Sequence, residues 1–242
     1  MSNIAIMTNE LTKKYSDVTA VNKLDLTIYE GELFSLLGVN GAGKTTTIKM
    51  LSCLINPTEG NAKIFNYDLL KEKQQIKQLI AVSPQQSAIA MNLSVRENIE
   101  LMAGVHGADR KKSRQKADEI INEFHLTEVE NKYASKLSGG WQRRLSIAMA
   151  LVSEPKILFL DEPTLGLDVI ARRELWTSIR QLKGKITIIL TTHYMEEAES
   201  LSDRLVIMKS GKKLAEGTVE EINNLAGKTK LEDSFINLIE EA

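Results

Sequence analysis

The sequence is poor in the features that mark secreted, membrane-spanning or disulfide-stabilised proteins. Its single cysteine, Cys53, excludes an internal disulfide framework and a cysteine-based zinc site. The longest unbroken apolar run, Ile147–Val152, is far shorter than the roughly 20 residues that span a bilayer. Residues Met1–Glu10 carry neither a basic region nor a long apolar stretch, so we expect no signal peptide. If a membrane is involved in the function, the chain must reach it through a partner.

An excess of charge of one sign is also lacking. The chain has 31 Lys and Arg against 32 Asp and Glu, which gives a net charge of −1. This balance provides no bulk electrostatic reason to bind nucleic acid or an anionic membrane. The 242 residues, 43% hydrophobic and 26% charged, fit a single ordinary globular domain with a hydrophobic core.

Strand-like and helix-like segments alternate through most of the chain. Uniform apolar runs such as 157–160 and 186–190 predict buried strands of a parallel sheet that is covered on both faces. The middle of the chain, about residues 85–155, is predicted to be a helical insertion. The predicted strands are 4–11, 18–28, 33–37, 64–65, 79–82, 157–160, 186–190, 204–208 and 212–216. The predicted helices are 44–54, 96–105, 110–124 with Asp109 as its cap, 140–153, 168–183, 194–200 and the tail from 219.

A glycine-rich loop follows one predicted strand and opens a helix. Gly38–Thr45 matches the pattern G-x-x-x-x-G-K-[ST], in the strand-and-helix context that the pattern needs. Glycines let the backbone turn tightly, so that successive N–H groups point at phosphate oxygens, and the helix start adds its dipole. Lys44 is expected to reach the β- and γ-phosphates, and Thr45 to place its hydroxyl on Mg²⁺. The alternative is a glycine-rich turn before an ordinary helix.

Two carboxylates end another predicted strand. The apolar run 157–160 is followed directly by Asp161 and Glu162, and functional groups of parallel sheets gather at the carboxyl ends of strands. We expect Asp161 to hold Mg²⁺ through a water, and Glu162 to orient and partly deprotonate the water that attacks the γ-phosphate. Because Asp-Glu-Pro is also common turn chemistry, the pair could instead be a polar strand end.

A second glycine motif opens a further helix. In Leu137–Gly140, Ser138 is a good N-cap residue, and the two glycines free backbone N–H groups at the helix start. The motif could be no more than a capped helix. A second anion-binding helix start is redundant for one nucleotide in one chain, however, and makes sense if it meets a nucleotide held by another chain.

Together these motifs resemble those of the ATP-binding cassette (ABC) ATPases over nearly the whole chain. Gly38–Thr45 is similar to Walker A, Ile157–Glu162 to Walker B and Leu137–Gly140 to the family signature. The family usually continues the signature with glutamine, where this chain has Trp141. Weaker matches follow the family order: an adenine-stacking aromatic, the Q-loop glutamine, the D-loop and the switch histidine, at Tyr15, Gln85, Leu165–Asp168 and His193.

The resemblance implies a fold and a set of site residues. The fold is α/β: a P-loop NTPase core with a parallel sheet, an N-terminal antiparallel β-subdomain and an inserted helical subdomain. Within one domain, 1–242, residues 1–85 and 156–217 form the core and β-subdomain, 86–155 the helical subdomain with the signature, and 218–242 a helical tail. The implied catalytic residues are Glu162, His193, Lys44 and Gln85, and the Mg²⁺ ligands are Thr45, Gln85 and Asp161. The implied ATP-binding residues are Tyr15, Gly38, Asn40, Gly41, Ala42, Gly43, Lys44, Thr45, Thr46, Ser138, Gly139, Gly140 and Asp168.

The resemblance also implies partners. Ser138–Gly140 of one subunit would contact the ATP held by a second, identical or related ATP-binding subunit, and Asp168 would link the two sites. Integral membrane permease subunits are expected to hold the protein at the cytoplasmic face of the membrane, and no nucleic acid is expected. Part of the docking surface would be Gln85–Val105, with Ile89, Met91 and Leu93 as candidate apolar contacts or ordinary core residues.

Within transporters the sequence looks most like the ATPases of ABC-2-type exporters, judged by residues 166–168, 191–199 and 231–235. The substrate would be chosen by the membrane subunit. One alternative is a soluble ABC ATPase that acts on nucleic acid or the ribosome, although such proteins usually have two cassettes, a long insertion or basic extensions. The other is an unrelated P-loop kinase or GTPase, which would leave Leu137–Gly140 and His193 unexplained.

Overall fold

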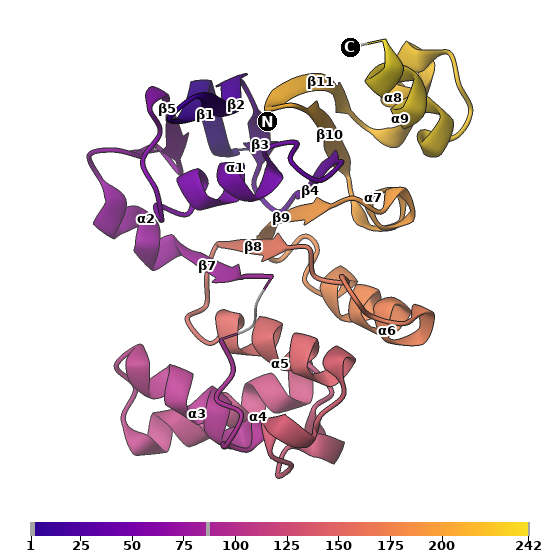
Figure 1. Cartoon of the computed structure of the whole chain (residues 1–242). Helices are drawn as coiled ribbons and strands as arrows, with labels where there is room; N and C mark the ends of the chain where they lie inside the picture. Colours follow the sequence, from indigo (N-terminus) through magenta and orange to yellow (C-terminus); the bar gives the residue numbers. More distant parts are fainter. Residues whose placement is uncertain (1–2, 86–87, 242) are drawn as a thin grey trace.

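The computed structural model describes residues 3–85 and 88–241, which form two sheets and the helices packed on them (Figure 1). The larger sheet has the strand order β11-β10-β4-β9-β8-β7. All its pairings are parallel except that of the edge strand β11 with β10, so the predicted parallel sheet is confirmed. Its strands are β4 (Leu33–Gly38), β7 (Ile80–Ser83), β8 (Ile157–Asp161), β9 (Thr187–Thr192), β10 (Arg204–Lys209) and β11 (Lys212–Gly217).

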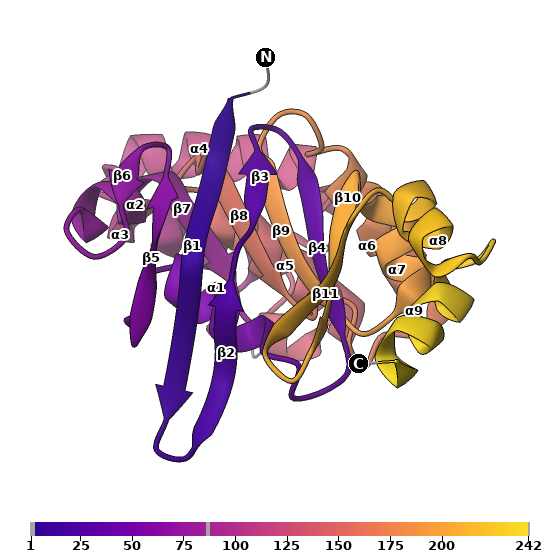
Figure 2. The same cartoon turned by 90° about the horizontal axis from the view of Figure 1, so that it is seen from above.

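The smaller sheet is antiparallel and lies on one side of the larger one (Figure 2). Its long strand β1 pairs with β2, β3 and β5. The predicted strand 18–28 is two strands, because Lys23 adopts a φ of 46° and the Asp25 carboxylate binds the Glu10 amide at the bend. The strands are β1 (Ile4–Tyr15), β2 (Val18–Leu24), β3 (Thr27–Tyr29), β5 (Glu59–Ile64) and β6 (Tyr67–Asp68).

Alternate residues of the central strands serve two different cores. Ile157 and Phe159 of β8 pack with the smaller sheet and the helix that follows the glycine-rich loop. Leu158 and Leu160 point to the other face and pack with the helical insertion. Since successive strand residues face opposite sides, a strand covered on both faces must be apolar throughout. This explains the uniform run 157–160.

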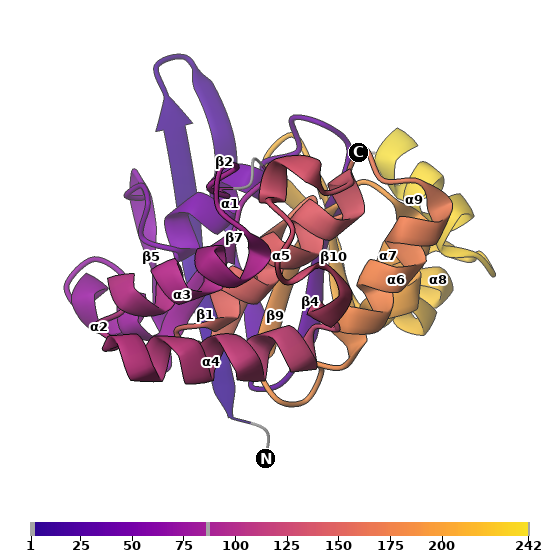
Figure 3. The ribbon, with the colours of Figure 1, turned by 90° about the horizontal axis from the view of Figure 1, so that it is seen from below.

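Helices cover both faces of the larger sheet, and the insertion forms a separate layer (Figures 1 and 3). Asp109 caps the second insertion helix by accepting the Lys112 amide, as predicted. Helices α1 (Lys44–Leu51) and α2 (Lys73–Leu79) precede the insertion, which holds α3 (Val95–Val105), α4 (Arg110–Glu123), α5 (Gly139–Leu151) and the 3₁₀ turns η1 (Thr127–Val129) and η2 (Ala134–Lys136). After it come α6 (Val169–Arg180), α7 (Met195–Leu201), α8 (Val219–Ala226) and α9 (Leu231–Glu240).

Before the insertion, the helices differ from prediction in two places. The first ends at Leu51 rather than Leu54, because Cys53 takes a left-handed φ of 58° and lets the chain cap its own helix before Asn56-Pro57. Helix α2 was not predicted, since Ile76 is its one buried residue and leaves no hydrophobic period to detect. Within residues 3–85 and 88–241, no helix is both long enough and apolar enough to cross a membrane.

Candidate active site

The glycine-rich loop connects β4 to α1 in a conformation that requires glycine. Gly41 and Gly43 have φ values of 83° and 101°, in the region that side chains rarely adopt. A Cβ atom on Gly43 would also lie 2.5 Å from the Ala20 carbonyl oxygen of β2. The loop therefore curls tightly at the start of α1, where free N–H groups and the helix dipole favour an anion.

Lys44, the first residue of α1, extends its side chain back into this loop. Its ammonium group donates hydrogen bonds to the carbonyl oxygens of Gly38 at 2.7 Å and Val39 at 3.2 Å. It also lies 3.3 Å from Glu162 Oε1, although the lysine side chain is only 6% exposed. Because its two hydrogen bonds go to neutral carbonyls, this buried cation is well placed to exchange them for phosphate oxygens, to which it binds more strongly.

Asp161 ends β8 beside the second residue of α1. Its Oδ1 atom accepts hydrogen bonds from Thr45 Oγ1 at 3.0 Å and from Thr191 Oγ1 at 2.6 Å. The first contact brings together two of the predicted Mg²⁺ ligands, from segments more than a hundred residues apart. Thr191 was not predicted, although it stands in the quoted run before His193 and at the carboxyl end of a neighbouring strand.

Glu162 is the next residue, and its backbone is held in a rare conformation. Its φ is 48°, and its amide donates to the carbonyl and hydroxyl oxygens of Thr191. The carboxylate is 9% exposed, with Oε1 facing Lys44 and Oε2 lying 2.7 Å from His193 Nδ1. A strained residue that is fixed by its neighbours is typical of functional sites. Here the strain aims one carboxylate between the lysine and the histidine.

These side chains open onto a cavity of about 640 Å³. Its wall also includes Val18, Thr19 and Ala20 of β2, Leu165 and Ser210. The predicted residues that line it are Asn40, Gly41, Ala42, Gly43, Lys44, Thr45, Thr46, Gln85, Glu162 and His193. Gly38 and Asp161 lie directly behind this wall, in contact with Lys44 and Thr45. The structure thus brings together most of the residues predicted for one nucleotide.

The remaining predicted residues lie outside the cavity wall. Tyr15, at the end of β1, is 46% exposed, and the Lys13 ammonium lies 5.1 Å from the centre of its ring. Asp168 is the N-cap of α6, where its carboxylate accepts the amides of Ile170 and Ala171. Its oxygen is therefore already engaged in holding the D-loop to its helix.

The second glycine motif begins α5 on the surface of the insertion. Ser138 and Gly139 are exposed. Ser138 occupies the N-cap position, but its side chain makes no capping hydrogen bond, so the prediction that it caps the helix was wrong in this respect. Among the described residues, the start of α5 therefore receives no hydrogen bond from its own N-cap side chain. Trp141 packs beneath the Arg144 guanidinium, 4.5 Å from the ring centre.

Glu197 of α7 is a fully buried carboxyl group behind the site, which the sequence did not single out. Its Oε1 atom accepts a hydrogen bond from Trp176 Nε1 at 2.9 Å, whereas Oε2 has no partner among the described residues. Burial raises the pKa of Glu197 above its ordinary value, and the nearby hydroxyls of Thr192 and Thr164 oppose this effect. Its hydrogen bond to Trp176 joins α6 and α7.

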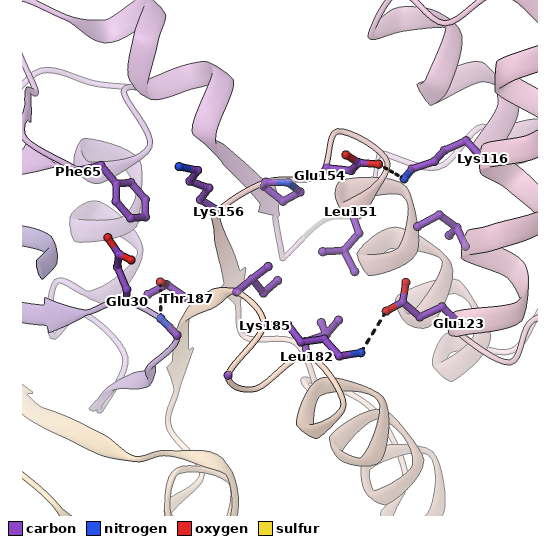
Figure 4. A pocket seen from close by; sticks show the side chains of 15 residues that line it. Glu30, Phe65, Lys116, Glu123, Leu151, Glu154, Lys156, Leu182, Lys185 and Thr187 are labelled. Atoms are coloured by element: carbon purple, nitrogen blue, oxygen red, sulfur yellow. Dashed lines mark hydrogen bonds and ion pairs between the residues drawn. The ribbon is translucent and has the colours of Figure 1, made fainter. Parts of the chain in front are cut away.

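A second cavity, of about 690 Å³, lies at the other end of the parallel strands, where β8 and β9 begin (Figure 4). Four of its charged side chains form ion pairs: Lys116 with Glu154, and Lys185 with Glu123 at 3.7 Å. None of the predicted site residues lines it. Although it is the roomier of the two cavities, it contains none of the phosphate-binding motifs, and we place the candidate active site at the glycine-rich loop.

The fold and this site define a P-loop nucleotide-binding ATPase. The chain matches the ABC transporter family over residues 21–165. It is 38% identical over 233 residues to a daunorubicin resistance ATP-binding protein of Streptomyces coeruleorubidus, covering 96% of this chain and 74% of the relative. It is 37% identical over 230 residues to a doxorubicin resistance ATP-binding protein of Mycobacterium tuberculosis, covering 94% and 70%.

Solved structures agree with this assignment. An ATP binding subunit of an ABC transporter superimposes with a TM-score of 0.84 at 27% identity, covering 97% of this chain and 99% of that one. A dimeric ATP-binding cassette bound to ADP and Pi has a TM-score of 0.78 at 29% identity, covering 88% and 98%. The chain belongs to the ABC transporter family and is an ATPase of that family. The resemblance inferred from its motifs is confirmed.

Proposed function

We propose that this ATPase powers an ABC exporter by dimerising around ATP while docked on separate membrane-spanning subunits at the cytoplasmic face of a membrane. The observation that carries the proposal is the position of Ser138 and Gly139, exposed at the start of α5 and outside the cavity of their own chain. The drug-resistance names of the relatives favour export. Because the membrane subunits would select the cargo, the proposal names no substrate.

Within one chain, the phosphate loop and the Walker B strand would share the chemistry. Lys44 would exchange its carbonyl partners for the β- and γ-phosphate oxygens of ATP. Glu162 would take a proton from the attacking water, since its carboxylate is buried and fixed between Lys44 and His193. His193 and Gln85 line the same cavity and would contact the γ-phosphate and the water.

The site also fits Mg²⁺, which would neutralise charge on the phosphates when bound. Mg²⁺ prefers oxygen ligands and commonly uses one or two protein groups, with phosphates and waters completing its shell. Thr45 and Asp161 supply a hydroxyl and a carboxylate 3.0 Å apart at the mouth of the loop. The described residues contain no cluster of three His, Cys, Asp or Glu side chains suited to a metal, in keeping with a shell completed by the nucleotide. Gln85, which lines the same cavity, is the third residue that would hold the ion.

The second subunit would complete the site. Its Ser138 hydroxyl and the amides of Gly139 and Gly140 would bind the γ-phosphate of the facing chain, as helix starts bind anions. Affinity between the subunits would then depend on that phosphate, and hydrolysis would shift the population toward the open pair. Asp168 would place the D-loop between the two sites.

The predicted docking segment presents apolar side chains on the insertion. Met91 is 44% exposed, whereas Ile89 and Leu93 are partly buried. Residues 86 and 87 of this segment lie outside the described residues. On α3, Leu101 and Val105 add two exposed apolar side chains one helical turn apart. We propose that Met91, Leu101 and Val105 contact the membrane subunit. Co-purification with the product of a neighbouring membrane-protein gene would support this contact.

Dimerisation is tested by blocking the start of α5. In a Glu162→Gln background, which preserves bound ATP, Ser138→Arg is expected to abolish the ATP-dependent dimer on size-exclusion chromatography with light scattering. Affinity for a fluorescent ATP analogue in dilute monomer should change by less than about threefold, because Ser138 is outside its own cavity. Ser135→Arg, a matched change at an exposed serine three positions earlier, should leave the dimer intact. An ATP-dependent dimer that survives Ser138→Arg would contradict the proposal.

A further inference from the structure

Arg143, in the second turn of α5, carries a buried charge that is bound by main-chain oxygens alone. The side chain is 6% exposed, and no carboxylate pairs with it in the described part of the chain. Its Nε atom donates to the Pro163 carbonyl at 2.9 Å, and Nη2 donates to the Asp161 carbonyl at 2.7 Å. Its Nη1 atom donates to the carbonyl of Pro84 and, at 3.4 Å, to that of Gln85.

The four carbonyls belong to two segments of the active site. Those of Asp161 and Pro163 stand immediately before and after Glu162, the residue with the left-handed backbone. Those of Pro84 and Gln85 stand where β7 gives way to the Q-loop. One planar guanidinium therefore joins the signature helix, the Walker B turn and the Q-loop, which come from three distant parts of the sequence.

An ordinary structural role does not require a charge at this position. Burial lowers the pKa of Arg143 to about 10, although the nearby Asp161 and Glu197 carboxylates oppose this effect, so the group is still protonated at neutral pH. Apolar residues of similar volume generally fill a core at no greater cost than a buried charge. What the guanidinium adds is a rigid fork of donors that fixes several oxygens in one geometry.

We propose that Arg143 is a positioning residue for ATP hydrolysis, which holds the backbone on both sides of Glu162 and the start of the Q-loop in register with the signature helix. The proposal rests on the roles proposed above for Glu162 and Gln85. A movement of α5 on meeting a second nucleotide would be transmitted through this fork to both residues. Arg143 would thus act on the transition state and not on the affinity for ATP, since it touches no residue of the phosphate loop.

The test separates turnover from nucleotide affinity in three variants. Arg143→Met removes all four hydrogen bonds and is expected to lower kcat at least about 10-fold, because small misplacements of catalytic groups cost that much or more. Affinity for a fluorescent ATP analogue should stay within about threefold of wild type. Arg143→Lys keeps the charge and part of the bonding, and should recover an intermediate kcat. Arg180→Met, at an exposed arginine of α6 that binds the Ser200 carbonyl, is the control that should keep turnover within about twofold.

Several results would overturn the proposal. Wild-type turnover in Arg143→Met would do so, as would a parallel fall in ATP affinity and kcat with no recovery in Arg143→Lys. If Arg143→Met fails to fold, Arg143→Lys decides: reduced kcat at unchanged ATP affinity supports the proposal, and unchanged kcat refutes it. Glu162→Gln, measured in parallel, separates failure of this proposal from failure of the proposed function. Normal turnover in Glu162→Gln would remove the proposed role of Glu162. Reduced turnover in Glu162→Gln together with normal turnover in the Arg143 variants would remove only the role of Arg143.

Discussion

Replacing Glu162 with glutamine changes one buried carboxylate into an amide of the same shape. The amide oxygen can still accept a hydrogen bond at the position of Oε2, 2.7 Å from His193 Nδ1, but it cannot take a proton from water. Loss of a general base slows proton transfer by about 10²–10⁴-fold. We therefore expect turnover to fall at least about 100-fold, which corresponds to about 2.7 kcal/mol in the activation barrier.

The ATP affinity of Glu162→Gln should not fall with its turnover. The carboxylate at Oε1 lies 3.3 Å from the Lys44 ammonium and competes with phosphate for it, so its removal should leave ATP affinity unchanged or higher. Steady-state phosphate release measures turnover, and a fluorescent ATP analogue measures affinity. Glu199→Gln, an exposed residue of α7, is the matched control and should behave as wild type. Hydrolysis by Glu162→Gln within a few-fold of wild type would remove Glu162 from the role of base.

Two further changes test the phosphate loop and the buried carboxyl group behind it. Lys44→Ala removes the main counter-charge for the phosphates, and at least about a 10-fold loss of ATP affinity or turnover is expected in the same two assays; full retention of both would count against the phosphate-loop assignment. Glu197→Gln should raise the free energy of unfolding relative to wild type more at pH 8 than at pH 5, measured by urea denaturation. Burial raises the pKa of Glu197, so the folded protein binds this proton more tightly than the unfolded chain, and wild-type stability falls as pH rises from the ordinary value of 4.5. An equal difference at both pH values would contradict this linkage.

Much of the core could be predicted because strands and glycines leave local signals. The runs 157–160 and 186–190 are apolar at every position, which only a strand covered on both faces requires. The phosphate loop requires glycine where another segment approaches it closely, since Gly43 has no room for a Cβ atom against the Ala20 carbonyl oxygen. Helix α2 could not be predicted because its residues are mostly exposed and carry no hydrophobic period, and the strand β6 has only two, half-buried residues, too few for a pattern.

The site was predictable in its residues but not in their contacts. Lys44, Asp161, Glu162 and His193 stand in recognisable patterns, whereas their distances depend on how β4, β8 and β9 are ordered in the sheet. Arg143 stands three residues after the signature motif, yet its buried position and its carbonyl partners arise from tertiary packing that no local pattern encodes. Arg143 binds main-chain oxygens, which every residue type has. The residue types at the positions that bind Arg143 therefore do not reveal these hydrogen bonds in the sequence.

The open start of α5 has a consequence for how stability depends on assembly. A helix whose N-cap side chain binds no amide is less stable by about 1 kcal/mol than a capped one. If the proposed pairing occurs, an anion brought by the neighbour would satisfy the same amides, and pairing would then remove a small deficit in stability of the isolated subunit. Heat resistance in the presence of ATP should then increase with protein concentration, as it does whenever association and folding are linked. A loose helix end would in this way make the lone subunit slightly less stable than the pair.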